Sequence, residues 1–332
     1  LDVGYPIFSA AFVSENTFAI TGGGGEGKNG VANKITILKI EDKDQVITEC
    51  DEFVLSKSED SPMSLDVSKD GLNLVAGVNC SSDAIRAGEN EHLRLFDLRD
   101  ERISAVSKSN VFKTTSLDSY QKCTRFSQSS KYLAIASSMG VISNLRFPSL
   151  SKVHENIVDE NEIQDVDYSL DEHLLAYSTE KHIQVLSAGT GKKLFRIEAT
   201  KERSFRSIKF VKSEVLEEYC LIVISNFAQR SGAAVERYRF TSDTKKLSAD
   251  KYQASAERSK LNKTVKAVTS MACSNELVAV AGADLTIRII RLKDLREIRV
   301  FKNVHSFSIT RLVFSPAGDV LVSTSVANSV AI

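Results

Sequence analysis

Short apolar runs, each about five residues long, follow one another along the whole chain and often alternate with polar positions. Turn residues separate the runs, β-branched residues dominate many of them, and no long segment has a helical period. This pattern predicts an all-β protein. Representative runs lie at residues 35–40, 72–76, 133–136, 174–177 and 320–322.

The runs form a repeating unit, in which a strand ends in an apolar residue plus Ser or a similar turn residue, and a second strand, a turn and a third strand follow. Towards the C-terminus the apolar positions are 42, 42, 62 and 42 residues apart, and steps of 55 and 59 precede them. A base period near 42 residues with loop insertions predicts a propeller with four-stranded blades. The apolar positions are Phe12, Val67, Phe126, Tyr168, Phe210, Ala272 and Phe314.

Seven such units predict a seven-bladed WD-type β-propeller that occupies residues 1–332 as a single domain. The chain has no tryptophan, so the W-D dipeptide of WD repeats is absent, and Phe96-Asp97 is its nearest substitute. The predicted blades span residues 7–55, 62–107, 119–158, 162–200, 203–255, 265–302 and 305–332.

The last predicted blade stops after its third strand, at residues 329–332. A ring must close, because an open blade leaves an unpaired strand edge. We therefore expect residues 1–4 to supply the missing outer strand of this blade. A segment that followed Ile332 would be the alternative source.

The charge of the chain is balanced, with 43 Lys plus Arg against 43 Asp plus Glu, which argues against a nucleic-acid partner. Residues 41–60 are locally acidic and residues 245–266 locally basic. Solvated loop surface is the favoured interpretation of both, and complementary patches for a charged partner are the alternative. The five cysteines contain no C-x-x-C pair, so neither a zinc site nor a disulfide framework is indicated, and no apolar run approaches the length of a membrane helix.

A glycine-rich segment at residues 22–30 matches parts of two nucleotide-binding motifs. Residues 22–28 fit the first seven positions of the P-loop G-x-x-x-x-G-K-[ST], but Asn29 replaces the hydroxyl residue, and Gly25, Gly27 and Gly30 spell G-x-G-x-x-G. Both motifs need a strand before the loop and a helix after it. Here both flanks read as strands, which argues against nucleotide binding.

The same segment holds six glycines in nine residues, far more than a connection between two strands needs. Each glycine costs conformational entropy on folding, so this density indicates left-handed backbone angles or a close approach of the backbone to another group. Exposed carbonyl groups there could bind a cation and exposed amides an anion. We expect a functional loop on one face of the propeller.

Other candidate residues favour structural roles. Asp159, Glu160 and Glu162 lie in a connecting turn, where solvation is favoured over acid–base chemistry. His305 and Asp284 occupy positions at which WD repeats commonly place a structural histidine and a turn-bonding aspartate. No catalytic triad can be assembled from local spacing.

Several segments of the chain together resemble a known family: residues 2–6, the glycine loop with residues 33–38, and residues 60–62, 92–94 and 304–310. This family comprises the fungal endoplasmic-reticulum guanine nucleotide exchange factors (the Sec-twelve family), which activate the small GTPase that initiates COPII coat assembly. The resemblance covers essentially the whole chain. Its most specific part is the motif G-G-G-G-E-G-x-N-G-x-x-N-K.

The resemblance implies a seven-bladed propeller whose loop Gly22 to Gly30 binds a potassium ion, while the chain itself binds no nucleotide. It implies that the loop and Asn33, the catalytic position in this sense, act on the switch and phosphate region of the GTPase and release GDP. Pro62 matches a proline whose loss harms function in the family. The other predicted partner-binding residues are Gly22, Gly23, Gly24, Gly25, Glu26, Gly27, Asn29, Gly30 and Lys34.

Members of the family carry a C-terminal membrane anchor, so the resemblance places this chain, itself soluble, at the cytosolic face of the endoplasmic reticulum. Ala32 departs from the family pattern, in which a proline precedes the asparagine. Paralogues with a degraded glycine loop have little exchange activity, and the intact Glu26, Gly27, Asn29 and Gly30 favour the active group. The alternatives are a propeller scaffold that binds the GTPase without exchange, and an enzyme that uses the loop for a phosphate or sugar.

Overall fold

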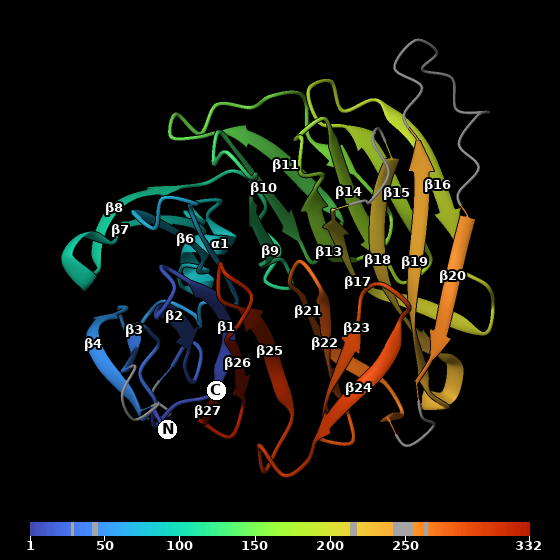
Figure 1. The fold of residues 1–332 in the computed structure, drawn as a ribbon. Coiled ribbons are helices and arrows are strands. Elements are labelled where there is room, and N and C mark those ends of the chain that lie inside the picture. The colour runs from blue at the N-terminus through green and yellow to red at the C-terminus, as the bar shows by residue number, and fades with distance from the viewer. Residues whose placement is uncertain (28–29, 42–45, 213–217, 242–254, 262–264) are drawn as a thin grey trace.

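The computed structural model describes residues 1–27, 30–41, 46–212, 218–241, 255–261 and 265–332. Its strands form seven antiparallel sheets, six of four strands and one of three, arranged around a central channel (Figure 1). Helical structure in these residues is limited to α1 (Ser82–Arg86) and two 3-10 turns, Arg99–Glu101 and Ala228–Arg230. The predicted all-β, seven-bladed propeller is therefore confirmed.

Each blade runs outwards from a strand that lines the channel. The first three blades contain β1 (Ile7–Phe12), β2 (Thr17–Gly22), β3 (Lys34–Glu41) and β4 (Val46–Val54); β5 (Ser64–Val67), β6 (Asn73–Gly77), β7 (Leu93–Asp97) and β8 (Ser104–Ser109); and β9 (Gln121–Phe126), β10 (Tyr132–Ser137), β11 (Val141–Arg146) and β12 (Ile157–Val158). The next two contain β13 (Ile163–Tyr168), β14 (Leu174–Thr179), β15 (His182–Ser187) and β16 (Lys193–Glu198); and β17 (Arg203–Val211), β18 (Glu218–Phe227), β19 (Ala233–Thr241) and β20 (Ser255–Lys260). The last two contain β21 (Val268–Cys273), β22 (Leu277–Gly282), β23 (Ile287–Arg291) and β24 (Arg296–Phe301); and β25 (Ile309–Phe314), β26 (Leu321–Ser325) and β27 (Val330–Ala331).

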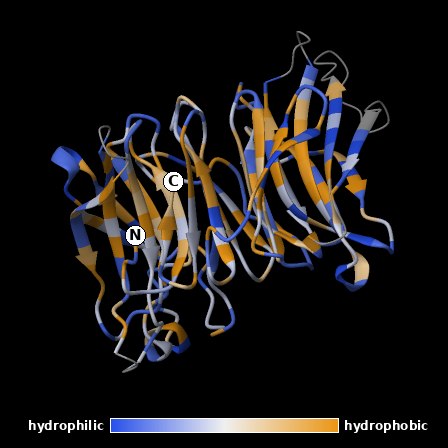
Figure 2. Cartoon of the chain, turned by 60° about the horizontal axis from the view of Figure 1, so that its bottom comes forward, coloured by the Kyte–Doolittle hydropathy of each residue, from blue (hydrophilic) through white to orange (hydrophobic). Residues whose placement is uncertain are grey.

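The second strand of each blade explains why many apolar runs are continuous rather than alternating. Both faces of this strand pack against neighbouring blades, so side chains that point to either face are buried. In β22, for example, Val278, Ala279, Val280 and Ala281 are all fully buried. The outer strand β4 instead has mostly exposed or half-buried residues. Apolar stretches accordingly run along the strands inside the blades (Figure 2).

The N-terminal residues close the ring, as predicted. The amide of Val3 donates a hydrogen bond to the carbonyl of Asn328 at 2.8 Å, and the amide of Val330 donates to the carbonyl of Leu1 at 2.8 Å. Asp2 and Ser329 pair as an antiparallel bridge. These contacts add a fourth, outer strand position to the sheet of β25, β26 and β27, and both chain ends lie beside it (Figure 1).

The prediction that Asp159 is a solvated residue of a connecting turn is wrong. Its side chain is only 6% exposed and accepts hydrogen bonds from His182 Nε2 at 2.8 Å and from the Tyr177 hydroxyl at 3.0 Å. Burial opposes its ionisation, but hydrogen bonds from Asn161 and Tyr177 and the neighbouring His182 lower the pKa of Asp159 to about 2. The neighbouring Glu160 is exposed, as expected.

The predicted structural roles of Asp284 and His305 are confirmed. Asp284 accepts a hydrogen bond from the Thr286 hydroxyl at 2.7 Å, within the turn between β22 and β23. The two ring nitrogens of His305 lie 2.7 and 2.8 Å from the hydroxyls of Ser329 and Ser323. Both residues thus fix connections within their blades.

The two charged segments are only partly described. Residues 42–45 of the acidic segment and 245–254 and 262–264 of the basic segment lie outside the described residues. Within the described part, all five cysteines are free thiols, and none of the helices has the length and apolar character that a membrane span requires.

We predict that Asp159→Ala lowers the free energy of unfolding by about 1–3 kcal/mol, because it leaves buried donors of His182 and Tyr177 without an acceptor. Urea unfolding measures this change. Glu160→Ala is the matched control, since it removes a neighbouring but exposed carboxylate and should change the stability by less than about 0.5 kcal/mol. Equal effects of the two substitutions would contradict the structural role of Asp159.

Candidate functional site

The glycine loop connects β2 to β3 of the first blade and is defined here as residues 22–34 (Figure 1). A strand, not a helix, follows the loop, so the helix N-terminus on which P-loop and dinucleotide motifs depend is missing. Lys28 and Asn29, the latter a predicted partner-binding residue, lie outside the described residues.

Asn33 lies inside the glycine loop, with only 5% of its surface exposed. Its Oδ1 accepts hydrogen bonds from the Gly25 amide at 2.9 Å and from the Ser61 hydroxyl at 3.0 Å. Its Nδ2 donates to the carbonyls of Gly25 at 2.9 Å and Glu59 at 2.8 Å. The side-chain amide thus makes four hydrogen bonds, which use both of its donors and both acceptor lone pairs. Asn33 thereby links Gly25 of the loop to residues 59–61, which connect the first two blades.

Gly22 and Gly23 are required because the backbone is tightly packed at both positions. A Cβ atom on Gly22 would lie 1.8 Å from the carbonyl oxygen of Pro6. A Cβ atom on Gly23, whose φ is +145°, would lie 2.3 Å from Oδ1 of Asn33. The predicted close approach of the glycine backbone to another group is therefore present. The groups that approach it are Pro6 and Asn33 of the same chain.

The segment that precedes the second blade binds the backbone of the loop at Glu26. Oδ1 of the half-buried Asp60 accepts hydrogen bonds from the amides of Glu26 at 3.2 Å and Ser61 at 2.8 Å. The amide of Asp60 donates to the carbonyl of Asn79 at 3.0 Å. The next residue in the chain after Ser61 is Pro62, which is buried immediately before β5. Pro62 therefore adjoins the site without lying on its surface.

Glu26 attaches the loop to α1 of the second blade. Its two carboxylate oxygens accept hydrogen bonds from the amide of Ser82, the first residue of α1, at 3.0 and 3.1 Å, and the Ser82 hydroxyl donates to the same carboxylate. These hydrogen bonds from the Ser82 hydroxyl and amide lower the pKa of Glu26. Glu26 is also exposed to solvent, so its carboxylate is ionised at neutral pH.

Glu59 supports the same segment through ion pairs with the second blade. Its carboxylate lies 2.8 Å from the guanidinium of Arg94, and the side chains are only 12% and 3% exposed. Burial opposes ionisation of Glu59, but the backbone hydrogen bond from Ser56 and the charges of Arg94 and Lys108 lower its pKa. Because the Glu59 carbonyl accepts from Asn33, this buried ion pair helps to hold the loop.

Lys34 marks the end of the loop and the start of β3. Its ammonium group lies 2.5 Å from Glu52 and 5.1 Å from the centre of the Tyr5 ring. These contacts engage the side chain with its own blade. The predicted partner-binding residues therefore divide into two groups. Gly22, Gly23, Asn33 and Pro62 are buried, and Gly25 and Lys34 are half-buried.

The exposed positions that form the surface of the loop are Gly24, Glu26, Gly27 and Gly30.

The sequence alone does not mark Ser82 as part of the site, because its only local signal is a Ser-Ser-Asp stretch typical of helix starts. Asp60 and Ser61 belong to the segments that resemble the family, but the sequence gives no other indication that they contact the loop.

A carboxylate-rich metal cage is not part of the described loop. The described residues contain no group of three or more His, Cys, Asp or Glu side chains placed to hold a metal ion. The oxygen donors near the loop are main-chain carbonyls, among them that of Gly25, and two carboxylates, those of Asp60 and of Glu26, the latter bound to Ser82. Such a set fits a hard cation of low charge better than a divalent ion, which prefers several carboxylates.

The chain is similar over 99% of its length to guanine nucleotide-exchange factors of yeasts. It is 29% identical to SEC12 of Candida glabrata and spans 70% of that protein. It is also 29% identical to SED4 of Saccharomyces cerevisiae, provisionally named an exchange factor, and spans 30% of it. No family model matches the chain.

A solved structure shows the same fold. Hydrazine synthase of Kuenenia stuttgartiensis superimposes with a TM-score of 0.68, covering 100% of this chain and 96% of the matched chain. The sequence identity is 11%, so this likeness supports the propeller fold alone.

We predict that Gly23→Ala dislodges the glycine loop, because the new methyl group would overlap Asn33 Oδ1. Gly30→Ala is the matched control: its φ is +83°, but no heavy atom lies within 4 Å of the new Cβ, so it incurs only about 1–2 kcal/mol of backbone strain. Hydrogen exchange of the Gly25 amide, measured by NMR, should become at least about tenfold faster in Gly23→Ala only. Equal protection of this amide in both variants would contradict the described packing.

Proposed function

Since the chain is a homologue of the Sec12 and Sed4 guanine nucleotide-exchange factors, we propose that it promotes the release of GDP from a small GTPase and uses the glycine loop to do so. The finer part of the proposal is that the GTPase is the one that initiates COPII coat assembly. The chain would then act at the cytosolic face of the endoplasmic reticulum, held there by an anchor elsewhere in the full protein.

The observation that carries this proposal is that the described part of the loop is both exposed and held in place by hydrogen bonds. Gly24, Glu26, Gly27 and Gly30 are exposed, while Asn33 holds the backbone behind them with four hydrogen bonds. A loop ordered before binding loses little conformational entropy on association, so more of its contact energy appears as affinity.

Nucleotide exchange needs no covalent chemistry from the propeller. An exchange factor binds the nucleotide-free GTPase more tightly than the GDP-bound form, and this differential affinity lowers the affinity for GDP by the same factor. The ionised Glu26 carboxylate at the loop surface would add repulsion near the phosphate groups of GDP. Glycines beside it let the backbone approach the phosphate-binding region and switch segments of the GTPase closely.

We propose that Asn33 acts as a positioning residue. Its amide group is buried, and all of its hydrogen bonds go to Gly25, Glu59 and Ser61, so its effect on the GTPase passes through the backbone that it holds. Pro62 supports the same connection from the start of the second blade.

We also propose that a potassium ion binds in the loop Gly22 to Gly30. Main-chain carbonyls of the loop, with the Asp60 carboxylate close by, would hold it. A bound cation would offset the negative ends of the carbonyl dipoles that hold it. The residues of this chain would still set the shape of the loop through Asn33 and Asp60.

A propeller that binds the GTPase without releasing GDP is the second candidate, because Sed4 proteins are among the relatives and are only provisionally named exchange factors. Measuring binding and GDP release on the same GTPase separates the two. Binding with an unchanged release rate would favour the scaffold.

Asn33→Ala is expected to slow GDP release at least about tenfold, which corresponds to about 1.4 kcal/mol and to the loss of buried hydrogen bonds that order the loop. Release of fluorescent GDP from the COPII-initiating GTPase measures the rate. Asn33→Asp retains the acceptors for Gly25 and Ser61 but places a buried carboxylate oxygen against the carbonyls of Gly25 and Glu59, so it should slow release at least as much as Asn33→Ala.

Asn275→Ala, in the exposed turn between β21 and β22, is the matched control and should exchange at the wild-type rate. Thermal unfolding of each variant establishes that the propeller is folded. Wild-type exchange by a folded Asn33→Ala protein would refute the assignment of the site.

Replacing potassium by sodium at equal ionic strength should slow exchange and make hydrogen exchange of the Gly25 amide faster. Sodium is smaller and more strongly hydrated, so it would satisfy the same carbonyl oxygens less well. The Asn33→Ala variant, whose loop is already loosened, should show a smaller difference between the two salts. If neither release rate nor amide protection depends on the cation, the potassium site is wrong.

A further inference from the structure

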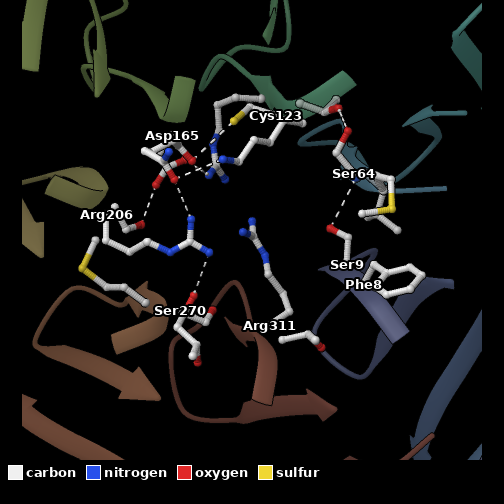
Figure 3. A pocket seen from close by; sticks show the side chains of 18 of the residues that line it. Phe8, Ser9, Ser64, Cys123, Asp165, Arg206, Ser270 and Arg311 are labelled. Carbon is white, nitrogen blue, oxygen red and sulfur yellow. Dashed lines mark hydrogen bonds and ion pairs between the residues drawn. The ribbon is translucent and has the colours of Figure 1, made fainter. Parts of the chain in front are cut away.

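The central channel of the propeller holds a cluster of basic side chains that the proposed exchange activity does not use. The part of the channel drawn in Figure 3 has a volume of about 230 Å³ and is lined by residues from the innermost strands of all seven blades. Its charged lining residues are Lys122, Arg125, Arg206 and Arg311 against a single acid, Asp165. The four bases minus one acid give this lining a formal charge of +3, although the whole chain has a net charge of zero.

Two of these bases already have acidic partners. Lys122 lies 2.7 Å from Glu162, and Arg125 lies 3.3 Å from Asp167 and 3.7 Å from Asp165. These ion pairs satisfy most of their charge.

The other two bases lack an acidic partner among the described residues. Arg206 donates to neutral acceptors, the side-chain oxygen of Gln164 at 2.8 Å and the carbonyl of Thr269 at 3.4 Å. The side chain of Arg311 makes no hydrogen bond or ion pair in the described part of the protein, and its Nε is buried without a partner. Both guanidinium groups point into the centre of the channel (Figure 3).

Arg311 also lacks a contact that three other blades make with the blade that follows. At the corresponding positions, Ser9, Asp165 and Ser270 accept hydrogen bonds from backbone amides of the next blade, at 3.4, 3.1 and 3.0 Å. An arginine has no acceptor and cannot make this contact. This contact between blades therefore does not explain an arginine at position 311.

The surroundings also disfavour the charge of Arg311. Burial, followed by the positive charge of Arg125, lowers the pKa of Arg311, and the negative charges of Asp165 and Asp66 oppose this only in part. An anion in the channel would reverse both effects, since it would pair with the guanidinium groups and offset their mutual repulsion.

We propose that the central channel binds a small oxyanion of the phosphate class, held by the guanidinium groups of Arg311 and Arg206. Planar guanidinium groups bind the oxygens of phosphate in pairs of parallel hydrogen bonds. Arg125, which also lines the channel, is already paired with Asp167 and Asp165. The site does not depend on the glycine loop or on exchange activity.

The test is thermal unfolding of the folded chain in inorganic phosphate, against sodium chloride of equal ionic strength. Phosphate should raise the midpoint of the wild-type protein by roughly 2 °C or more, whereas Arg311→Gln should show no difference between the two salts. Arg291→Gln is the matched control, because it removes an exposed arginine paired with Asp294 outside the channel, and it should keep the phosphate effect.

Arg311→Gln also distinguishes binding from a structural role. If Arg311 serves an anion, the variant should unfold in sodium chloride at the same temperature as the wild type or higher, because a buried uncompensated charge is gone. If Arg311 instead supports the fold, the variant unfolds at a lower temperature. A lower midpoint in chloride, a phosphate effect that persists in Arg311→Gln, or no phosphate effect in the wild type would each overturn the proposal.

Discussion

The side-chain amide of Asn33 is the contact on which the described part of the glycine loop depends. It is buried, and its four hydrogen bonds join Gly25 at the crest of the loop to Glu59 and Ser61 at the base. A glycine-rich segment has little intrinsic preference for one conformation, because each glycine lowers the cost of alternatives. One buried amide with every donor and acceptor satisfied can impose a single conformation, since breaking any of its bonds leaves a polar group unpaired.

Contacts with the second blade also hold the glycine loop, although the loop is part of the first blade. Glu59 pairs with Arg94 of β7, and Glu26 accepts from Ser82 at the start of α1, so the second blade holds the loop of the first at two points. The Asp60 amide bonds to Asn79, whose side chain donates to the carbonyl of Ser119 before the third blade. The position of the loop therefore depends on the packing of three consecutive blades, which a closed ring keeps fixed.

The fold could be predicted from the sequence because it repeats. Anchors such as Phe126, Tyr168 and Phe210, 42 residues apart, each lie at or next to the last residue of an innermost strand. The position of the glycine loop followed from the strands at its flanks. The burial of Asn33 could not be predicted, because its partners Glu59 and Ser61 are distant in sequence and a polar residue beside glycines reads as exposed. Asp159 was mispredicted for the same reason, since its partners Tyr177 and His182 lie in the next blade.

The central channel shows a second limit of sequence reasoning. Equal numbers of acids and bases conceal the positive channel, because its charged residues are far apart in the sequence and only ring closure brings them together. Lys122 and Arg125 come from β9, Arg206 from β17 and Arg311 from β25, which belong to three different blades. The two features also differ in how their polar groups are satisfied. All hydrogen-bonding groups of the Asn33 side chain are satisfied within the protein, so this residue stabilises one conformation of the loop. The guanidinium of Arg311 has no partner among the described residues, and we expect it to lower the stability of the protein until an anion binds. The fully paired amide of Asn33 thus acts as a structural constraint, whereas the guanidinium of Arg311, which has neither a hydrogen bond nor an ion pair in the described residues, is the observation behind the proposed anion site.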